Sequence, residues 1–108
     1  MANSFKNAGV AVGTSRTTLY TCPAGKEAVI HALYLSNIDG TNSVTADIEI
    51  TIDGGTTYRY IGKTLAVPAD STLIPDKPIN LEAADILAIT ASATGDLEAV
   101  CSILEITP

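Results

Sequence analysis

Few residues in this chain could carry acid–base or nucleophilic chemistry. The sequence has a single histidine, His31, which lies among apolar residues in the segment Val29–Leu33. Nucleophilic catalysis needs a nucleophile, a base and a group that orients the base. A histidine embedded in an apolar stretch is typical of a structural side chain within a sheet, so we predict no catalytic role for His31.

Asp47 and Glu49 are a second candidate, because residues two apart share one face of an extended strand. Acid–base hydrolysis requires two carboxyl groups in a cleft, with pKa values that differ. Carboxylates that alternate with apolar residues more often keep the outer face of a strand in water. We therefore predict no catalytic residues and expect that the protein is not an enzyme.

Metal ligands and phosphate-binding motifs give no stronger signal. Turn segments 39–43 and 53–55 carry oxygen-bearing side chains, but neither has the calcium loop that closes with a bidentate Glu. Turn formation explains the same residues, which leaves calcium as an alternative. The sequence has no glycine-rich phosphate loop. We predict no metal and no cofactor.

The two cysteines, Cys22 and Cys101, lack the spacing of a metal site. The first residues of the chain include no apolar segment, so we expect no signal peptide and a reducing cytoplasm. Free thiols that pack as small apolar side chains follow from that environment. A disulfide stays open as an alternative, because the cysteines lie on segments that could pair.

Aromatic residues are the remaining candidates for recognition. Phe5 is an isolated apolar residue in a polar stretch, and we expect it to contact a partner. Tyr58 and Tyr60 fall on one face of a strand, which is the arrangement of a sugar-binding platform. Cross-strand packing is the plainer interpretation of these two tyrosines, and the sugar platform is the alternative.

Charge restricts the classes of partner. The formal net charge is −6 and the basic residues are scattered, whereas nucleic-acid binding needs clusters of Lys and Arg. No apolar run approaches the roughly 20 residues of a membrane-spanning helix. Only 17% of the residues are charged, against about 25% in an average domain. We predict no nucleic-acid and no membrane partner, and a surface suited to packing against other proteins.

The elements that position these side chains are strands. In segment 44–52 apolar and polar residues alternate, which is the period of a strand with one buried face. We predict that Glu49 and Thr51 face water or a partner. The Asp53-Gly54 turn predicts an antiparallel hairpin with segment 57–61. The apolar residues expected to face the core are Val44, Ala46, Ile48, Ile50 and Ile52.

The other segments complete an all-β pattern. Segment 27–36 is apolar at most positions, which predicts a central strand covered on both faces. Prolines confine segment 65–81 to short edge pieces. Turn signals about every 8–12 residues predict a single domain over 1–108, an antiparallel β-sandwich or jelly roll of about eight short strands. Residues 1–16 are expected to form an edge strand or an arm. Further strands are expected at 17–21, 86–91 and 97–106, with a turn at 82–85.

Three segments together resemble a known family. They are Leu19-Tyr20-Thr21-Cys22-Pro23-Ala24-Gly25-Lys26, Val67-Pro68-Ala69-Asp70-Ser71, and Leu81-Glu82-Ala83-Ala84-Asp85-Ile86-Leu87 with the closing strand 97–106. Over positions 17–106 the chain resembles small β-sandwich virion structural proteins of tailed bacteriophages. In that family a Pro-Ala-Gly turn opens the sandwich, and a Leu-Glu-Ala-Gly-Asp corner precedes the last strands. Ala84 stands where the corner has glycine.

The resemblance implies a non-enzymatic part of a viral particle. Such a protein decorates or cements the capsid, or sits in the neck, tail or baseplate. It implies a homotrimer or a larger ring, contacts with other virion proteins such as the major capsid protein, and a place in the virion after assembly in the host cytoplasm. A carbohydrate-binding adhesion module on the same sandwich, with Tyr58 and Tyr60 as its platform, is the alternative.

Overall fold

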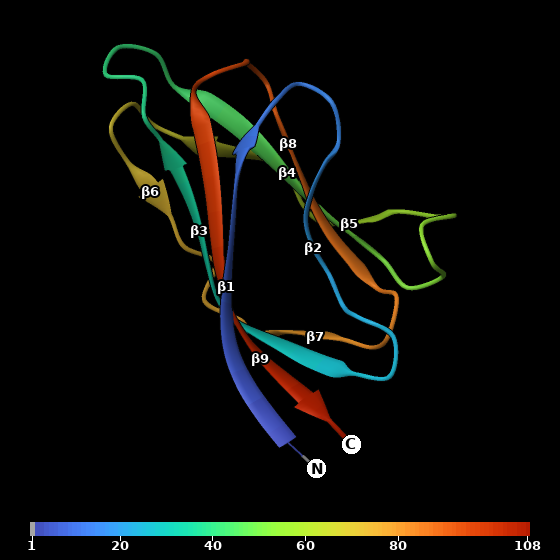
Figure 1. The fold of residues 1–108 in the computed structure, drawn as a ribbon. Coiled ribbons are helices and arrows are strands. Elements are labelled where there is room, and N and C mark those ends of the chain that lie inside the picture. The colour runs from blue at the N-terminus through green and yellow to red at the C-terminus, as the bar shows by residue number, and fades with distance from the viewer. Residues whose placement is uncertain (1) are drawn as a thin grey trace.

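The computed structural model of the chain describes residues 2–108 and has nine β-strands and no helix in that range (Figure 1). The strands are β1 (Ala2–Val12), β2 (Thr17–Thr21), β3 (Glu27–Asn37), β4 (Val44–Thr51), β5 (Arg59–Val67), β6 (Thr72–Leu73), β7 (Ile79–Leu81), β8 (Ile86–Ala91) and β9 (Leu97–Thr107). Sheet A has the order β1-β9-β3, with β6 and β7 both paired to β3, and sheet B has the order β2-β8-β4-β5. All pairs are antiparallel, which confirms the predicted fold class.

The strand pairs are nested along the chain. β1 pairs with β9, β2 with β8, β3 with β6 and β7, and β4 with β5. The chain therefore runs as one long antiparallel hairpin whose tip is the β4–β5 turn. Successive pairs alternate between the two sheets, so the hairpin wraps around itself, which is jelly-roll topology. The expected eight strands agree with this wrap, since β6 and β7 are two short pieces beside one strand.

The tip of this long hairpin is the predicted Asp-Gly turn. Gly54 and Gly55 have positive φ angles of 76° and 100°, which side chains other than glycine rarely adopt. The carboxylate of Asp53 accepts hydrogen bonds from the amide of Thr57 at 2.9 Å and from the hydroxyl of Thr51 at 2.7 Å. These bonds, the one from Thr57 first, hold the pKa of Asp53 below its usual value.

The core lies between the inner faces of the two sheets and is aliphatic. Burial of each large side chain there contributes about 1.5–3 kcal/mol to stability. The largest fully buried side chains include Ile30, Leu35, Leu97 and Ile103 of sheet A and Ile48, Leu87 and Ile89 of sheet B. No helix among the described residues is long and apolar enough to cross a membrane.

The inner face of β4 is buried only over its first half. Val44, Ala46 and Ile48 are buried as predicted, but Ile50 is half-buried and Ile52 is 69% exposed. The prediction for Ile52 was wrong because sheet A does not extend over the end of β4.

The outer face of β4 also differs from the prediction. Glu49 and Thr51 are buried instead of facing water. Arg16 pairs with the carboxylate of Glu49, and the turn after β4 folds back so that the amide of Gly55 donates to the Thr51 hydroxyl at 3.0 Å. The alternating pattern assigned both residues to water, but a contact from a distant segment covers Glu49 and the local turn covers Thr51.

The prediction that β3 is covered on both faces was wrong. β3 is central in sheet A, but its residues alternate between buried and exposed or half-buried. A sandwich has only two layers, so each sheet keeps one face outside. His31 lies on the outer face, where the register of β3 against β9 shifts between Ile30 and Ala32. It is exposed rather than packed in a core.

The first residues form an edge strand of sheet A. β1 pairs with β9 in continuous register from Ala2 to Val12. Figure 1 shows the start of β1 and the end of β9 side by side, extending together away from sheet B. Of the two expectations for this segment, the structure has the edge strand and not the arm.

The three segments that carry the family resemblance form turns of one geometry. In each turn the amide of the fourth residue donates to the carbonyl of the first: Lys26 to Pro23, Ser71 to Pro68, and Asp85 to Glu82. The third residue has a positive φ: 75° at Gly25, 55° at Asp70 and 72° at Ala84. Such a turn favours glycine at its third position, so Ala84 occupies a glycine position in conformation as well as in sequence.

Replacing Ala84 with glycine is therefore expected to raise the free energy of unfolding by about 0.5–1 kcal/mol. The Cβ of Ala84 makes its left-handed conformation unfavourable, and the gain is reduced by the greater freedom of glycine in the unfolded chain. Denaturant unfolding measures the difference. The matched variant Gly25→Ala, with open space around the added Cβ, should destabilise by about 1 kcal/mol. Equal free energies of unfolding for Ala84→Gly and Gly25→Ala would contradict this account.

Candidate interaction surfaces and a buried charge cluster

The outer face of sheet A is nearly free of charge in its central part. Residues paired directly across strands share a face, and the register aligns three outward rows across β1, β9 and β3. These rows define what we call the charge-poor face: Phe5, Leu104 and Val29; Asn7, Ser102 and Ala32; Gly9, Val100 and Tyr34. Charged residues enter only in the flanking rows, as Glu27 and Glu98.

Phe5 is the most exposed large apolar side chain of this face. It is 81% exposed, and Tyr34 and Val100 are also exposed. Its ring contacts that of His31 edge-on, with 6.4 Å between the ring centroids. Interface cores are depleted of charge and enriched in aromatic residues, and contiguous exposed apolar patches mark interaction sites. Phe5 thus lies exposed on a face whose central rows carry no charge, and its contact with a partner stays a prediction.

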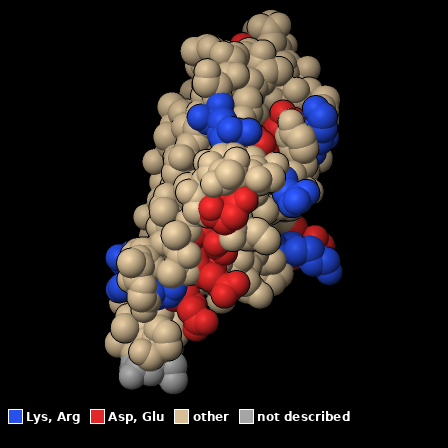
Figure 2. All heavy atoms as spheres, turned by 90° about the vertical axis from the view of Figure 1, so that its right-hand side faces the viewer, with Lys and Arg blue, Asp and Glu red and all other residues tan. Residues whose placement is uncertain are grey.

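The outer face of sheet B is different because it carries an ion pair and two tyrosines. Arg16 Nη2 lies 3.0 Å from Glu49 Oε2 and Nε lies 3.3 Å from Oε1, a two-pronged contact. The guanidinium also stacks over the ring of Tyr58 at 3.8 Å, and the ammonium of Lys63 lies 4.9 Å from the Tyr60 ring centroid. On the side of the molecule where the β4–β5 turn projects, charged side chains of both signs are spread along the surface (Figure 2).

Tyr58 and Tyr60 therefore each have a cation over the ring. Tyr58 is half-buried and Tyr60 is exposed. A sugar would have to use the opposite faces of these rings or displace Arg16 and Lys63. The sugar platform stays a prediction, and the cation–π contacts give the two tyrosines a structural role of their own.

The residues considered for catalysis are each engaged elsewhere or lie on different sheets. The carboxylate of Asp47 accepts a hydrogen bond of 2.7 Å from the amide of Thr64, a residue whose φ angle is 53°. The carboxylate of Glu49 is paired with Arg16. His31 lies on the opposite sheet. In the described part of the chain, no group of three or more His, Cys, Asp or Glu is placed to hold a metal ion.

Both cysteines are free and buried. Burial raises the pKa of the Cys101 thiol to about 11 and also raises the pKa of Cys22. Thiols with raised pKa values are poor nucleophiles because little thiolate forms. Of the two alternatives, the structure contains free thiols that pack as small apolar side chains.

A buried carboxylate joins the two sheets near the ends of β1 and β9. Glu105 is only 2% exposed. Its Oε2 accepts a hydrogen bond of 2.6 Å from the Tyr20 hydroxyl. Its Oε1 makes no aligned hydrogen bond with the described residues and is instead held by the ammonium groups of Lys6 at 3.0 Å and Lys26 at 3.6 Å.

These contacts shift two pKa values in opposite directions. The hydrogen bond from Tyr20, assisted by Lys6 and Lys26, lowers the pKa of Glu105. Burial, followed by the hydrogen bond to Glu105, raises the pKa of Tyr20. The carboxylate therefore stays ionised and the phenol neutral near neutral pH. Through Lys6 and Lys26 the cluster links the edge strand β1 and the β2–β3 turn to Glu105 of β9, which is a structural role.

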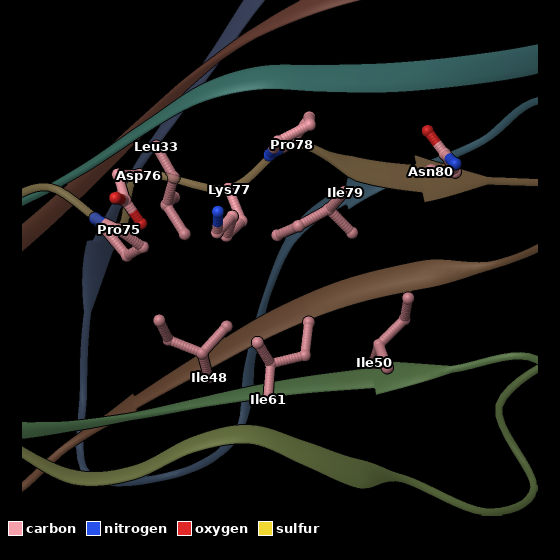
Figure 3. Close-up of a pocket in the computed structure, with 10 residues that line it drawn as sticks. All are labelled: Leu33, Ile48, Ile50, Ile61, Pro75, Asp76, Lys77, Pro78, Ile79 and Asn80. Carbon is pink, nitrogen blue, oxygen red and sulfur yellow. The ribbon is translucent and has the colours of Figure 1, made fainter.

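A groove opens at one side of the sandwich, between the edges of the two sheets. Its volume is about 460 Å³. Figure 3 shows Leu33 and Ile79 pointing into it from one layer and Ile48, Ile50 and Ile61 from the other. The rest of the wall is the segment from Pro75 to Asn80, which carries the two charged residues of the lining, Asp76 and Lys77. We call this opening the side groove.

The fold is that of a class of proteins built as a jelly-roll sandwich, and solved structures share it. A subunit of Bacillus endospore appendages, described as disulfide-linked pili, is 18% identical with a TM-score of 0.57, covering 98% of this chain and 87% of that one. The capsid of Helicobacter pylori bacteriophage KHP30 gives 14% identity and a TM-score of 0.55, with coverage of 97% and 87%.

A third likeness is to infectious bursal disease virus, strain Gx, at 12% identity and a TM-score of 0.54. It covers 96% of this chain but 30% of the viral chain. No protein-family model and no curated protein sequence matches this chain. The structural likenesses show a shared fold.

Two features of these surfaces escaped sequence reasoning. Glu105 had a signal, because it continues the inward-facing series Leu97, Ala99, Cys101 and Ile103 at every second position. An acidic residue in such a series indicates a buried charge that needs partners. The side groove had no local signal, because its lining comes from four separate parts of the chain.

Proposed function

We propose that this protein is a structural subunit of a viral particle, in which it assembles with copies of itself and with other particle proteins. The observation that carries the proposal is the charge-poor face with Phe5 at its edge. The central rows of this face carry no charge, and exposed apolar side chains on such a surface are typical of a protein contact. The fold supports the proposal, because it recurs in subunits of a bacteriophage capsid and of a pilus.

The specific role that we propose is decoration or cementing of the capsid. The family resemblance of the three turns points to tailed bacteriophages, and the candidate partners are a homotrimer or larger ring of this chain and the major capsid protein. Subunits in a ring protect the exposed edges of sheets. A neck, tail or baseplate position is the alternative within the same class. We infer that the protein is not an enzyme, because His31 lies on the opposite sheet from Asp47 and Glu49 and the carboxylate of Glu49 is paired with Arg16.

Quantitative mass spectrometry of purified particles tests this role. We expect the chain in the particles at a copy number comparable with that of the major shell protein. A small fixed number of copies would instead indicate the neck, tail or baseplate. Absence from the particles would overturn the proposal, and a glycan array would then test the adhesion alternative.

Truncating Phe5 tests the surface that carries the proposal. We expect Phe5→Ala to weaken self-association or particle binding by roughly tenfold to thirtyfold, because an aromatic side chain that is 81% exposed in the free chain would be buried in the contact. The free energy of unfolding should change by less than about 0.5 kcal/mol. Tyr60→Ala, which removes an exposed aromatic residue from sheet B, is the matched control. Equal effects of the two variants on association would argue against the charge-poor face.

A further inference from the structure

The side groove exposes part of the inner surface of sheet B. Along β4 the inward-facing residues pass from Ile48, which is 1% exposed, to the half-buried Ile50, and Ile52, the first residue after the strand, is 69% exposed. Ile61 of β5 lies beside them and is also exposed. These side chains belong to a core by their pattern, yet sheet A does not cover them.

The wall of the groove explains why it stays open. Only Ile79–Leu81 of this wall pairs with β3, as β7. Pro75 and Pro78 lack amide protons, so they cannot extend the pairing, and their rings fix the backbone. The two proline rings therefore fix the backbone of this segment, and only its last residues pair with β3. The groove is therefore built into the fold.

Two opposite charges lie next to each other in this wall. Asp76 and Lys77 both line the groove, and both are exposed. Among the described residues the ion pairs are those of Lys6, Arg16 and Lys26, so neither Asp76 nor Lys77 has a partner there. When a second copy is related by a two-fold rotation, the negative charge of each groove can face the positive charge of the other, and the two apolar openings cover each other.

We propose that the side groove is a two-fold contact between two copies of this chain. In a two-fold interface, if residue i of one copy contacts residue j of the other, then j also contacts i. Asp76 of each copy pairs with Lys77 of the other, and the exposed Ile52 and Ile61 of each copy cover the groove of its partner. The contact deepens the self-assembly in the proposed function and rests on that part of it, but it uses a surface separate from the charge-poor face.

The charges favour a second copy over a small amphiphilic ligand. The carboxylate of a fatty acid would be attracted by Lys77 but repelled by Asp76. A cationic amphiphile would be attracted by Asp76 but repelled by Lys77. A second copy satisfies both charges at once. It also supplies aliphatic side chains of the kind that line the groove.

Charge reversal in purified protein tests this contact through sedimentation equilibrium. In Asp76→Lys both reciprocal pairs become Lys–Lys contacts, and in Lys77→Asp both become Asp–Asp contacts. Each variant alone should weaken dimerisation by about tenfold, since exposed ion pairs are individually modest. The double reversal should restore it, and an equimolar mixture of the two single variants should form heterodimers. Rescue by mixing requires that residue 76 of one copy pairs with residue 77 of the other, and association that stops at a dimer indicates two-fold symmetry.

An apolar variant and its control complete the test. Ile61→Lys should weaken dimerisation by at least tenfold, whereas Tyr60→Lys, its neighbour on the opposite face of β5, should not. A monomeric wild-type chain at high concentration would overturn the proposal, as would single reversals that have no effect or that mixing does not rescue. These results are separate from the proposed function, because particle incorporation is measured in the virus and dimerisation in the isolated chain.

Discussion

Replacing Glu105 with alanine is expected to lower the free energy of unfolding by about 2–4 kcal/mol. Its carboxylate is buried and accepts a short hydrogen bond from Tyr20, and bonds to charged groups contribute about 1.5–3 kcal/mol. The variant also leaves the Tyr20 hydroxyl without its partner. Lys6 and Lys26 can turn toward water, since their side chains are 50% and 33% exposed, which keeps the loss below that of a fully buried ion pair.

The same cluster makes stability depend on pH in a defined direction. The pKa of Glu105 is lower in the folded chain than its ordinary value of 4.5, with the hydrogen bond from Tyr20 as the main cause. The contribution of its ionised form is therefore complete above pH 4.5 and is lost as the pH falls through the folded pKa. We expect the wild-type chain to lose stability on acidification below that pH, and Glu105→Ala to lose less.

Two variants separate the parts of the cluster. Glu105→Gln retains an acceptor for Tyr20 but no charge, so it should destabilise less than alanine and remove the acid-dependent loss. Tyr20→Phe should move the acid-induced loss to higher pH, because the hydrogen bond that lowers the pKa of Glu105 is gone. Denaturant unfolding over a pH series measures both. An acid response of Glu105→Gln that equals the wild type would assign the pH dependence to other carboxyl groups.

Ile103→Ala is expected to cost about 3–4 kcal/mol of folding free energy. The side chain is fully buried between the sheets, and truncating a buried isoleucine leaves a cavity as well as removing transfer energy. Association of the protein that remains folded should be unchanged, because Ile103 does not reach the surface. Chemical denaturation gives the stability, and sedimentation of the folded fraction gives the association.

Leu104, the next residue of β9, provides the matched comparison. It points outward between Phe5 and Val29 on the charge-poor face and is half-buried. Leu104→Ala should cost only about 1 kcal/mol in stability and should weaken association by roughly tenfold. If Leu104→Ala instead lowers stability as much as Ile103→Ala and leaves association intact, the outer face is structural and the proposed interface is wrong.

Local sequence signals determined the strands and turns of this protein. The alternation in 44–52, the Asp-Gly turn and the short proline-bounded pieces before β8 all have counterparts in the structure. The turn at 82–85 was also predicted and forms with Ala84 at positive φ. These features depend on side-chain period and backbone conformational freedom, which residues close together in the chain decide.

The tertiary structure alone decided which faces are covered. β3 has apolar residues on both faces, yet only two layers exist, so Val29 and Tyr34 lie on the outer face of sheet A instead of in a core. Glu49 looked like a solvated residue until Arg16, distant in the sequence, reached it. Ile52 continues the apolar positions of the alternating pattern, but it is exposed because sheet A does not extend over it.

The physical reason is that an apolar face is buried only if a strand distant in the sequence is placed over it when the long hairpin wraps into two sheets. Each strand specifies that it has an apolar face, but not whether another layer of the same chain reaches that face. Pro75 and Pro78 stop β6 and β7 short and leave the side groove open, and Phe5 lies on the outer face of sheet A, which no other layer of this chain covers. The sequence by itself determined the sandwich, and the lengths and placement of its layers decided which apolar surfaces are left for partners.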